Sequence, residues 1–247
     1  MNRPAFEEHW RRRFTQRGLT QQDDAGIAGW SETGLQTRMR AFRRVWGGGG
    51  DAAGLWADVG CGAGTYTRFL AEQGLAVLGM DYSAPSVCKA RERSPQVSGW
   101  LVGDATRLPL AARSLDGVLC FGVLQALSSP DKALSELAAT LKPGGCLWVD
   151  ALNARCLPHR VKRLLRRPQN LRYDRAADLL DRLRAQGLDA SLHWVPILPA
   201  RLQALQPLLE SRFMRAVLKA VPPLAALLSH SMLIVATRPA SQDGGAR

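Results

Sequence analysis

Short apolar runs alternate with segments of helical spacing between residues 55 and 152. The apolar runs lie at 55–60, 76–81, 98–104, 115–122 and 145–152, and the helical segments at 65–74, 84–94 and 130–141. Near-continuous apolar strands are typical of parallel sheets, because such sheets are covered by helices on both faces. The pattern therefore predicts a doubly wound α/β domain, whose ligands bind at the carboxyl ends of the strands.

Both ends of the chain extend this core. We expect a helical N-terminal cap or lid at residues 1–50, an α/β domain at 51–239 and a disordered tail at 240–247. Within the domain, a helix at 174–188 that begins at Asp174, and strands at 190–198 and 231–239, complete a mostly parallel, seven-stranded sheet. Residues 198–228 are largely apolar and predict a helical insertion before the last strand.

Positive charge is concentrated in the last part of the chain. The net charge is +12. Residues 151–247 carry 16 basic and 6 acidic residues, and 157–172 carry six basic residues and no acid. Such an excess attracts nucleic acid, an anionic membrane surface or an anionic small molecule, and it does not determine the fold. A solvated, Arg-rich helix is an equally good interpretation of 157–172.

The remaining composition narrows the function classes. The five cysteines form no C-x-x-C pair and lie in or beside apolar runs, so we expect buried thiols in a reducing compartment and no metal site. The N-terminus lacks the apolar region of a secretion signal, and the late apolar region is too interrupted to span a bilayer. We therefore expect a cytoplasmic protein, with peripheral membrane contact as an open alternative.

A glycine-rich loop follows the first strand. The sequence "ADVGCGAGTYTR" places Gly60, Gly62 and Gly64 after Asp58. Glycines let the backbone turn tightly and approach a ligand closely at the start of a helix. The G-x-G-x-x-G fingerprint of nicotinamide-dinucleotide enzymes is absent in either register, because Thr65 or Thr67 occupies its last position.

Two more acids stand at the ends of the next strands. Asp81 ends the second strand, at 76–81, where a carboxylate can accept hydrogen bonds from both hydroxyls of a ribose. Asp104 ends the third strand. Together with Asp58, these acids predict one acidic crevice. Such a crevice suits a cationic nucleoside better than a pyrophosphate.

With these motifs, the chain resembles the class I S-adenosylmethionine-dependent methyltransferases, in particular the branch of quinone-biosynthesis methyltransferases. The resemblance is carried in order by "ADVGCGAG", "GMDYS", "GDATRLPL" and the block from "SLDGVLCFGVLQAL" to "ATLKPGG". It covers about residues 55–150 densely. It implies a Rossmann-like fold and S-adenosylmethionine as the cofactor.

The resemblance also implies which residues contact the cofactor. Gly60, Gly62 and Gly64 would pack against its methionine and ribose portions, and Asp58 would serve its amino group. Cys61 would be a small residue beside it rather than a nucleophile, because no pairing base can be named.

The later motifs complete this set. Asp81 would bind the ribose hydroxyls, with Tyr82 beside the adenine. Asp104 would accept from the adenine amino group, with the Ala105 backbone nearby. Two residues of the fourth strand would touch the cofactor, namely Cys120 and Phe121.

The family often carries a histidine where this chain has Gln125, so the sequence names no catalytic base. Methyl transfer tolerates this, because the sulfonium already activates the methyl group and positioning supplies much of the catalysis. His159 could act as a base, but a solvated loop histidine is the simpler interpretation. We expect His9 at the surface and His193 in packing.

Two segments could border the acceptor. Trp30, with Arg38 or Arg40, would line a lid over the cofactor and the acceptor. Alternatively, residues 25–42 form a helix that only packs on the sheet. Residues 198–228 would cover an apolar acceptor or lie on a membrane, or else form a helical pair buried on the domain.

These observations favour a methyltransferase that acts on an amphiphilic or anionic small molecule. The alternatives are an RNA or protein methyltransferase and a cofactor-binding scaffold without turnover. The basic segment contains no aromatic residue for base stacking, which argues against RNA.

Overall fold

The computed structural model describes residues 4–47, 54–168 and 170–240, and its strands form one sheet in the order β3-β2-β1-β4-β5-β7-β6. The strands are β1 (Leu55–Val59), β2 (Ala76–Asp81), β3 (Gly99–Val102), β4 (Leu115–Cys120), β5 (Leu141–Leu152), β6 (Asp189–Val195) and β7 (Ser231–Thr237). The first five strands are parallel to one another, and β7 runs antiparallel to β5 and β6. The predicted mostly parallel, seven-stranded sheet is confirmed.

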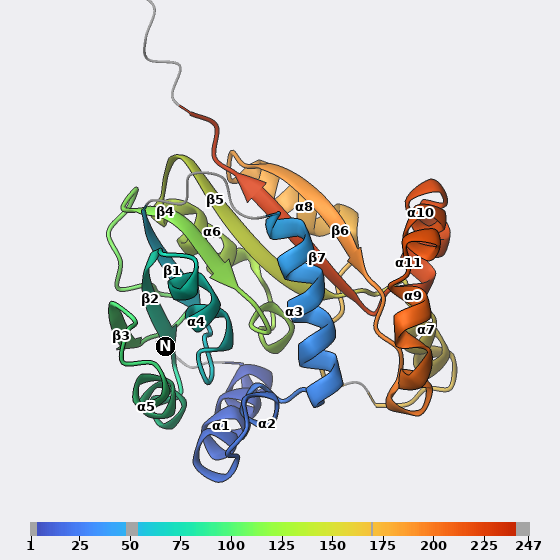
Figure 1. Cartoon of the computed structure of the whole chain (residues 1–247), viewed down its shortest axis with the longest axis horizontal. Coiled ribbons are helices and arrows are strands. Elements are labelled where there is room, and N and C mark those ends of the chain that lie inside the picture. Colours follow the sequence, from blue (N-terminus) through green and yellow to red (C-terminus); the bar gives the residue numbers. More distant parts are fainter. Residues whose placement is uncertain (1–3, 48–53, 169, 241–247) are drawn as a thin grey trace, which may run out of the picture.

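Helices cover both faces of the sheet. Figure 1 shows α3 (Glu32–Trp46) and α4 (Thr65–Glu72) in front, with α6 (Asp131–Thr140) and α8 (Ala176–Ala185) behind. Helix α5 (Ala84–Arg93) packs beside β2 and β3. Each face therefore buries its own apolar core, as the near-continuous apolar strands predicted.

Aromatic rings fill the front core. The ring of Phe42 on α3 is buried, with 1% of its surface exposed. Its centroid lies 5.2 to 5.6 Å from those of the rings around it, which belong to Trp46, Tyr66, Phe69, Phe121 and Trp148. Pairs of this kind contribute about 0.5–1.5 kcal/mol beyond their buried area. The packing anchors α3 to the sheet.

The first two helices lie across the carboxyl ends of the parallel strands. Figure 1 shows α1 (Ala5–Thr20) and α2 (Asp24–Ala28) below these ends. Helix α1 comes closest to α5 at Gly18, where an added Cβ would lie 2.6 Å from Ser86 Oγ. The expected cap is thus helical. The expected boundary at residues 50 and 51, and the tail from 241, lie outside the described residues.

Two local predictions need correction. Helix α8 begins at Ala176 and has Arg175, rather than Asp174, at its N-cap position. The Asp174 side chain accepts hydrogen bonds from Arg172, and its backbone pairs with Asn153, so it is committed to the loop before the helix. The strand expected at 145–152 is longer in the structure, because β5 begins at Leu141 and includes the sequence "KPGG".

Short helices follow β5 and β6. They are α7 (Leu157–Leu164), then η2 (Ala200–Leu205), α9 (Gln206–Leu209), α10 (Arg212–Ala220) and α11 (Pro222–Leu228). The helical insertion before β7 is confirmed. It is buried only in part. Leu218, Ala225 and Ala226 of α10 and α11 are buried, whereas the side chains of Leu205, Leu208 and Phe213 are 53%, 61% and 75% exposed.

Candidate functional site

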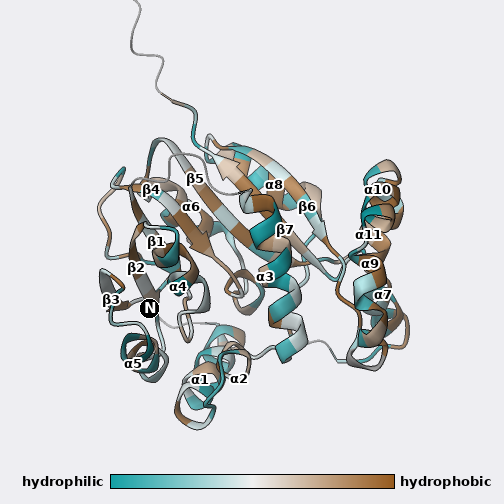
Figure 2. Cartoon of the chain, viewed as in Figure 1, coloured by the Kyte–Doolittle hydropathy of each residue, from teal (hydrophilic) through white to brown (hydrophobic). Residues whose placement is uncertain are grey.

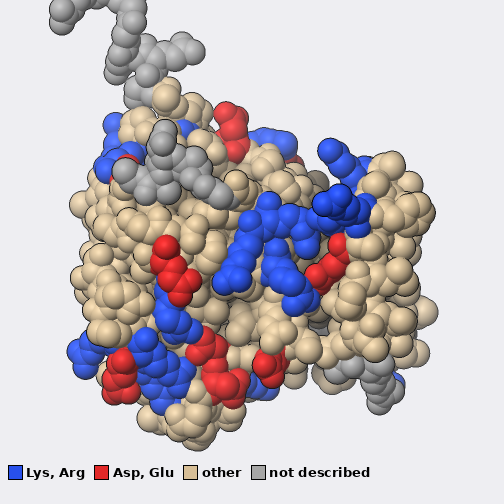
Figure 3. Space-filling model, in the orientation of Figure 1, with Lys and Arg blue, Asp and Glu red and all other residues tan. Residues whose placement is uncertain are grey.

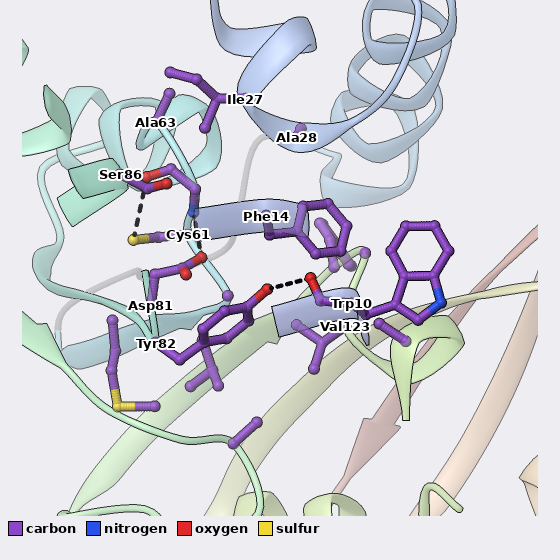
Figure 4. Close-up of a pocket in the computed structure, with 18 of the residues that line it drawn as sticks. Trp10, Phe14, Ile27, Ala28, Cys61, Ala63, Asp81, Tyr82, Ser86 and Val123 are labelled. Atoms are coloured by element: carbon purple, nitrogen blue, oxygen red, sulfur yellow. Dashed lines mark hydrogen bonds between the residues drawn. The ribbon is translucent and has the colours of Figure 1, made fainter. Parts of the chain in front are cut away.

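A crevice opens at the carboxyl ends of β1, β2, β3 and β4, beneath α1 and α2 (Figure 4). Eight residues predicted at the cofactor line it, namely Gly60, Cys61, Gly62, Asp81, Tyr82, Asp104, Ala105 and Phe121. The sequence motifs, which are spread over about sixty positions, therefore meet at one place. Parallel strands produce this convergence, because their carboxyl ends share one edge of the sheet.

The glycine loop is held against the second strand. The backbone N–H groups of Gly60 and Cys61 both donate to the carbonyl oxygen of Met80, at 2.7 and 3.0 Å. Gly60 has φ +83°, and a Cβ there would lie 2.2 Å from Val123 Cγ2. A side chain at Gly60 would therefore be strained and would also displace the wall of the crevice.

Asp81 ties the same loop to the end of β2. One carboxylate oxygen accepts from the backbone N–H of Gly62 at 3.0 Å, and the other accepts from the N–H of Ser83 at 2.8 Å. Burial raises the pKa of Asp81, while these hydrogen bonds act in the opposite direction. Figure 4 shows Asp81 and Tyr82 side by side on the wall of the crevice.

The other three predicted residues lie behind this surface. Asp58 is 1% exposed and accepts from Thr67 Oγ1 at 2.6 Å. Burial raises its pKa to about 7, and the nearby Asp81 charge acts in the same direction. Cys120 is buried in the core on the face of α6 and α8. Gly64, with φ +81°, begins α4 and faces Trp100. None of the three lines the crevice.

Asp104 is occupied by protein partners. One of its oxygens accepts from the backbone N–H and the hydroxyl of Thr106, both at 2.9 Å, and the other accepts from Arg11 Nη1 at 2.9 Å. The Arg11 guanidinium also lies 4.9 Å from the centre of the Tyr82 ring. The Tyr82 hydroxyl donates to the Trp10 carbonyl at 3.3 Å. Helix α1 is therefore fastened to the rims of β2 and β3.

Sequence reasoning missed these residues of α1. Glu7, Trp10, Arg11 and Phe14 all line the crevice. They are spaced at three or four residues, which places them on one helix face. That spacing was the available signal, but nothing in the sequence showed which surface this face would meet.

Trp30 lies at the crevice, as the lid interpretation of its segment predicted. Its side chain lines the crevice, and the Arg38 guanidinium lies 4.4 Å from its ring centre. Arg38 is itself buried, with its Nε 3.7 Å from an oxygen of Asp150. Arg40 instead makes two hydrogen bonds to Glu210, at 2.8 and 2.9 Å, away from the crevice.

A second, wider cavity adjoins the crevice. The two share four lining residues, which are Trp10, Phe14, Ala28 and Trp30. The adjoining cavity continues to Gln125, Tyr173 and His230. Gln125 is buried, and its Oε1 has no hydrogen-bond partner among the described residues. An incoming ligand with a donor group could satisfy this oxygen.

Tyr173 and His230 were not singled out from the sequence. The Tyr173 hydroxyl lies 3.4 Å from His230 Nε2. Burial lowers the pKa of His230 to about 4, so its ring is neutral near pH 7 and can accept a hydrogen bond. The two residues are 57 positions apart, and only the return of the chain at β7 brings them together.

The three histidines considered from the sequence have different surroundings. His159 was expected in a solvated loop, but it is 7% exposed and its ring stacks on Tyr173 with centroids 4.0 Å apart. His9 is exposed, as expected, and His193 is half-buried in β6.

The cysteines differ in their burial. Burial raises the pKa of the Cys61 thiol, so this thiol is a poor nucleophile. Cys88 is exposed on α5, contrary to the expectation of buried thiols.

Comparisons with known proteins agree with the resemblance to methyltransferases. Residues 57–149 match the family model of a methyltransferase domain. The biotin biosynthesis bifunctional protein BioHC of Cellvibrio japonicus is 36% identical over 95 residues, covering 38% of this chain and 19% of that protein. A demethylmenaquinone methyltransferase of Renibacterium salmoninarum is 38% identical over 92 residues, covering 37% of this chain and 38% of that enzyme.

The fold match extends further than the sequence match. The magnesium protoporphyrin IX methyltransferase of Synechocystis PCC 6803, solved with bound S-adenosylhomocysteine, superposes with a TM-score of 0.64. The superposition covers 95% of this chain and all of that one, at 17% identity. The sequence alignments span less than half the length of the two curated relatives. What those relatives share with this chain in sequence is therefore a segment of 92 to 95 residues.

Proposed function

Because the chain contains a class I S-adenosylmethionine-dependent methyltransferase domain, we propose that it transfers the cofactor's methyl group to a small, amphiphilic acceptor. The observation that carries this proposal is the crevice itself, where a glycine loop without room for a Cβ at Gly60 lies beside Asp81 and Asp104, at the ends of two neighbouring strands. This chemistry fits a nucleoside that carries a positive charge.

In our proposal, the cofactor lies along the loop of Gly60, Gly62 and Gly64. Asp58, from behind the loop, attracts the amino group through water. Cys61 leaves space beside the methionine portion. Gly60 and Gly62 of this loop line the crevice, which supports placing the cofactor there.

The nucleoside portion would occupy the outer half of the crevice. Asp81 would accept hydrogen bonds from the ribose hydroxyls, and Tyr82 would lie beside the adenine. Asp104 and the Ala105 backbone would meet the adenine edge, with Arg11 remaining on the far oxygen of Asp104. Two residues at the end of β4 would border the methyl group. Cys120, the last residue of the strand, would do so through its backbone, and Phe121, which follows it, through its ring.

The acceptor would enter through the adjoining cavity. Trp10, Phe14 and Trp30 separate this cavity from the crevice and would keep water away from the methyl group. The cofactor, when bound, supplies an activated methyl group, so the protein's task is to hold the acceptor in line. Gln125, Tyr173 and His230 are the polar groups available to orient it.

This arrangement favours a small acceptor over a macromolecule. Aromatic side chains line the inner wall, and α1 lies across it, so the crevice suits a small molecule better than a nucleic-acid strand or a folded protein. We further propose that the acceptor is amphiphilic and that the protein makes peripheral contact with a membrane. No helix in the described part of the chain has the length and hydropathy of a bilayer-spanning segment.

Calorimetric titration with S-adenosylhomocysteine tests the cofactor assignment. We expect binding by the wild-type protein and about 10-fold to 100-fold weaker binding by Asp81→Asn, since a hydrogen bond to a charged group contributes ~1.5–3 kcal/mol. Asp189→Asn, at an exposed position of β6, is the matched control. The melting temperatures without ligand separate a loss of binding from a loss of folding. Absence of binding by the wild-type protein would refute the proposal.

A further inference from the structure

Helix α7 exposes both an apolar face and a basic face. Its apolar residues are spaced at three and four positions, and their side chains are exposed by 49%, 43%, 82% and 57% for Leu157, Val161, Leu164 and Leu165. This spacing places them on one side of the helix. In a helix docked on its own domain that side would be covered. Here only His159 is buried.

The other side of α7 is cationic. Three basic residues of the helix are exposed, namely Arg160, Lys162 and Arg163, and the turn that follows it exposes Arg166 and Arg167. Within residues 4–47, 54–168 and 170–240, none of them forms an ion pair. An exposed helix with one apolar and one basic face is typical of segments that lie in a membrane interface.

A second apolar row lies on η2 and α9. Leu202 and Leu205, three residues apart on the 3₁₀ helix η2, are 48% and 53% exposed, and Leu208 on α9 is 61% exposed. Phe213, at the start of α10, is 75% exposed. Figure 2 shows apolar residues along α9 and α10, and Figure 3 shows an extended uncharged surface in this region with Lys and Arg beside it.

The two apolar rows stand at the rim of the adjoining cavity. Pro158 and Lys162 of α7 line this cavity, and so do Leu198, Pro199 and Gln203 from the other side. Both rows therefore lie beside the same opening. The cavity leads from there past Tyr173 to Trp30, at the edge of the crevice.

We propose that α7 and the η2–α10 segment form a docking surface for an anionic phospholipid bilayer, so that the adjoining cavity opens toward the lipid. The apolar rows enter the interface, and the basic side chains of α7 meet the phosphate groups. An amphiphilic acceptor could then pass from the bilayer into the cavity without crossing water. This last step rests on the proposed methyl transfer, whereas docking does not.

A bilayer fits these observations better than a nucleic acid does. Basic residues alone would suit either anion. However, nucleic acids are bound through phosphate charge and aromatic stacking. The four exposed aliphatic side chains of α7 and its C-cap, and the four exposed apolar side chains of η2, α9 and α10, would contribute little to such binding. The single acid of the insertion, Glu210, is neutralised by Arg40, so it does not repel an anionic surface.

Vesicle co-sedimentation of the full chain tests the proposal. The probes are vesicles of phosphatidylcholine alone and of equal parts phosphatidylcholine and phosphatidylglycerol. We expect salt-sensitive binding to the anionic vesicles only. Arg163→Gln, Arg166→Gln and Arg167→Gln together should weaken this binding by roughly 100-fold, at about fivefold for each charge. Leu164→Glu with Leu165→Glu should weaken it by at least about 10-fold.

Matched controls distinguish this surface from bulk properties. Leu19→Glu with Val102→Glu changes residues that are 58% and 57% exposed elsewhere on the molecule. Arg91→Gln, Lys132→Gln and Arg175→Gln together make the same change in net charge at other exposed positions. Both controls should bind vesicles within about twofold of the wild type, since docking depends on local rather than total charge.

Three results would overturn the proposal. One is no binding of the wild type to anionic vesicles. Another is unchanged binding by Leu164→Glu with Leu165→Glu. The third is binding to polyuridylate that exceeds vesicle binding and is lost only in the Arg triple variant. S-adenosylhomocysteine affinity, measured separately, should be the same in all docking variants. A failure of docking is thereby distinguished from a failure of the proposed function.

Discussion

The guanidinium of Arg11 lies 2.9 Å from the carboxylate of Asp104 and ties helix α1 to the end of β3. The two side chains are 30% and 19% exposed, so the ion pair is partly screened by solvent and contributes only about 1 kcal/mol. Since α1 covers the crevice and contributes Trp10 and Phe14 to its wall, we expect this modest interaction to hold α1 over the proposed cofactor site.

Replacing Arg11 should therefore change the rate of cofactor exchange. We expect Arg11→Gln to raise the dissociation rate of S-adenosylhomocysteine by about fivefold, corresponding to the loss of ~1 kcal/mol. Stopped-flow displacement measures this rate. Arg12→Gln is the control, because Arg12 lies on the same helix with its side chain 78% exposed. Equal rates for both variants would show that the ion pair does not hold the cover.

Two glycines with the same backbone conformation differ in their surroundings. Gly60 has φ +83° and Gly74 has φ +84°, but an added Cβ meets Val123 at 2.2 Å in the first case and nothing within 4 Å in the second. Gly74→Ala should lower the free energy of unfolding by about 1–2 kcal/mol, the cost of the left-handed conformation. Gly60→Ala should lose ~1–3 kcal/mol more through crowding and should also lose cofactor binding. Urea denaturation and calorimetry distinguish these outcomes, and equal effects would contradict the account.

Asp58 should make stability depend on pH. Its pKa is raised from 3.8 to about 7 by burial, so between these values the folded protein retains a proton that the unfolded chain has lost. Stability from this group is therefore full at acidic pH and declines as the pH rises from about 4 to about 7, by up to ~4 kcal/mol.

Asp58→Asn mimics the protonated carboxyl and keeps an oxygen that can accept from Thr67. Relative to this variant, the wild type should lose free energy of unfolding between pH 5 and pH 7. Urea denaturation at the two pH values measures the difference. Parallel pH dependence in the two proteins would show that Asp58 does not titrate in this range.

Arg38 and Arg40 are two residues apart and have opposite surroundings. Arg38 is buried beside the buried Asp150, whereas Arg40 is about half exposed where it pairs with Glu210. Arg38→Met should cost about 3–5 kcal/mol of unfolding free energy, because it leaves Asp150 as an uncompensated buried charge. Arg40→Met should cost ~1 kcal/mol or less. If adding Asp150→Asn to Arg38→Met restores no stability in urea denaturation, the buried pair is not the cause.

The fold and the cofactor side of the site could be predicted because their signals are local. The strands at 76–81 and 115–122 were recognisable as continuous apolar runs, and the loop of Gly60 and Gly62 stands directly after β1. The parallel topology then brings Asp81 and Asp104 to the same edge of the sheet. No long-range contact had to be guessed for this part.

The other side of the site depends on contacts between distant segments. Arg11 and Asp104 are 93 positions apart, and Tyr173 meets His230 only through the return of β7. His159 was misplaced for the same reason, because its burial comes from stacking on Tyr173. Sequence periodicity describes the faces of single helices and strands, and it does not show which distant segments meet.

Methyl transfer itself is the most direct test of the central claim. The purified protein is incubated with S-adenosylmethionine labelled in its methyl group and with a cell extract, which is then separated into organic-soluble, RNA and protein fractions. We predict label in the organic-soluble fraction, suppressed by excess S-adenosylhomocysteine and absent with Gly60→Ala. Label in RNA or protein, or no transferred label in any fraction, would contradict the assignment of this protein as a small-molecule methyltransferase.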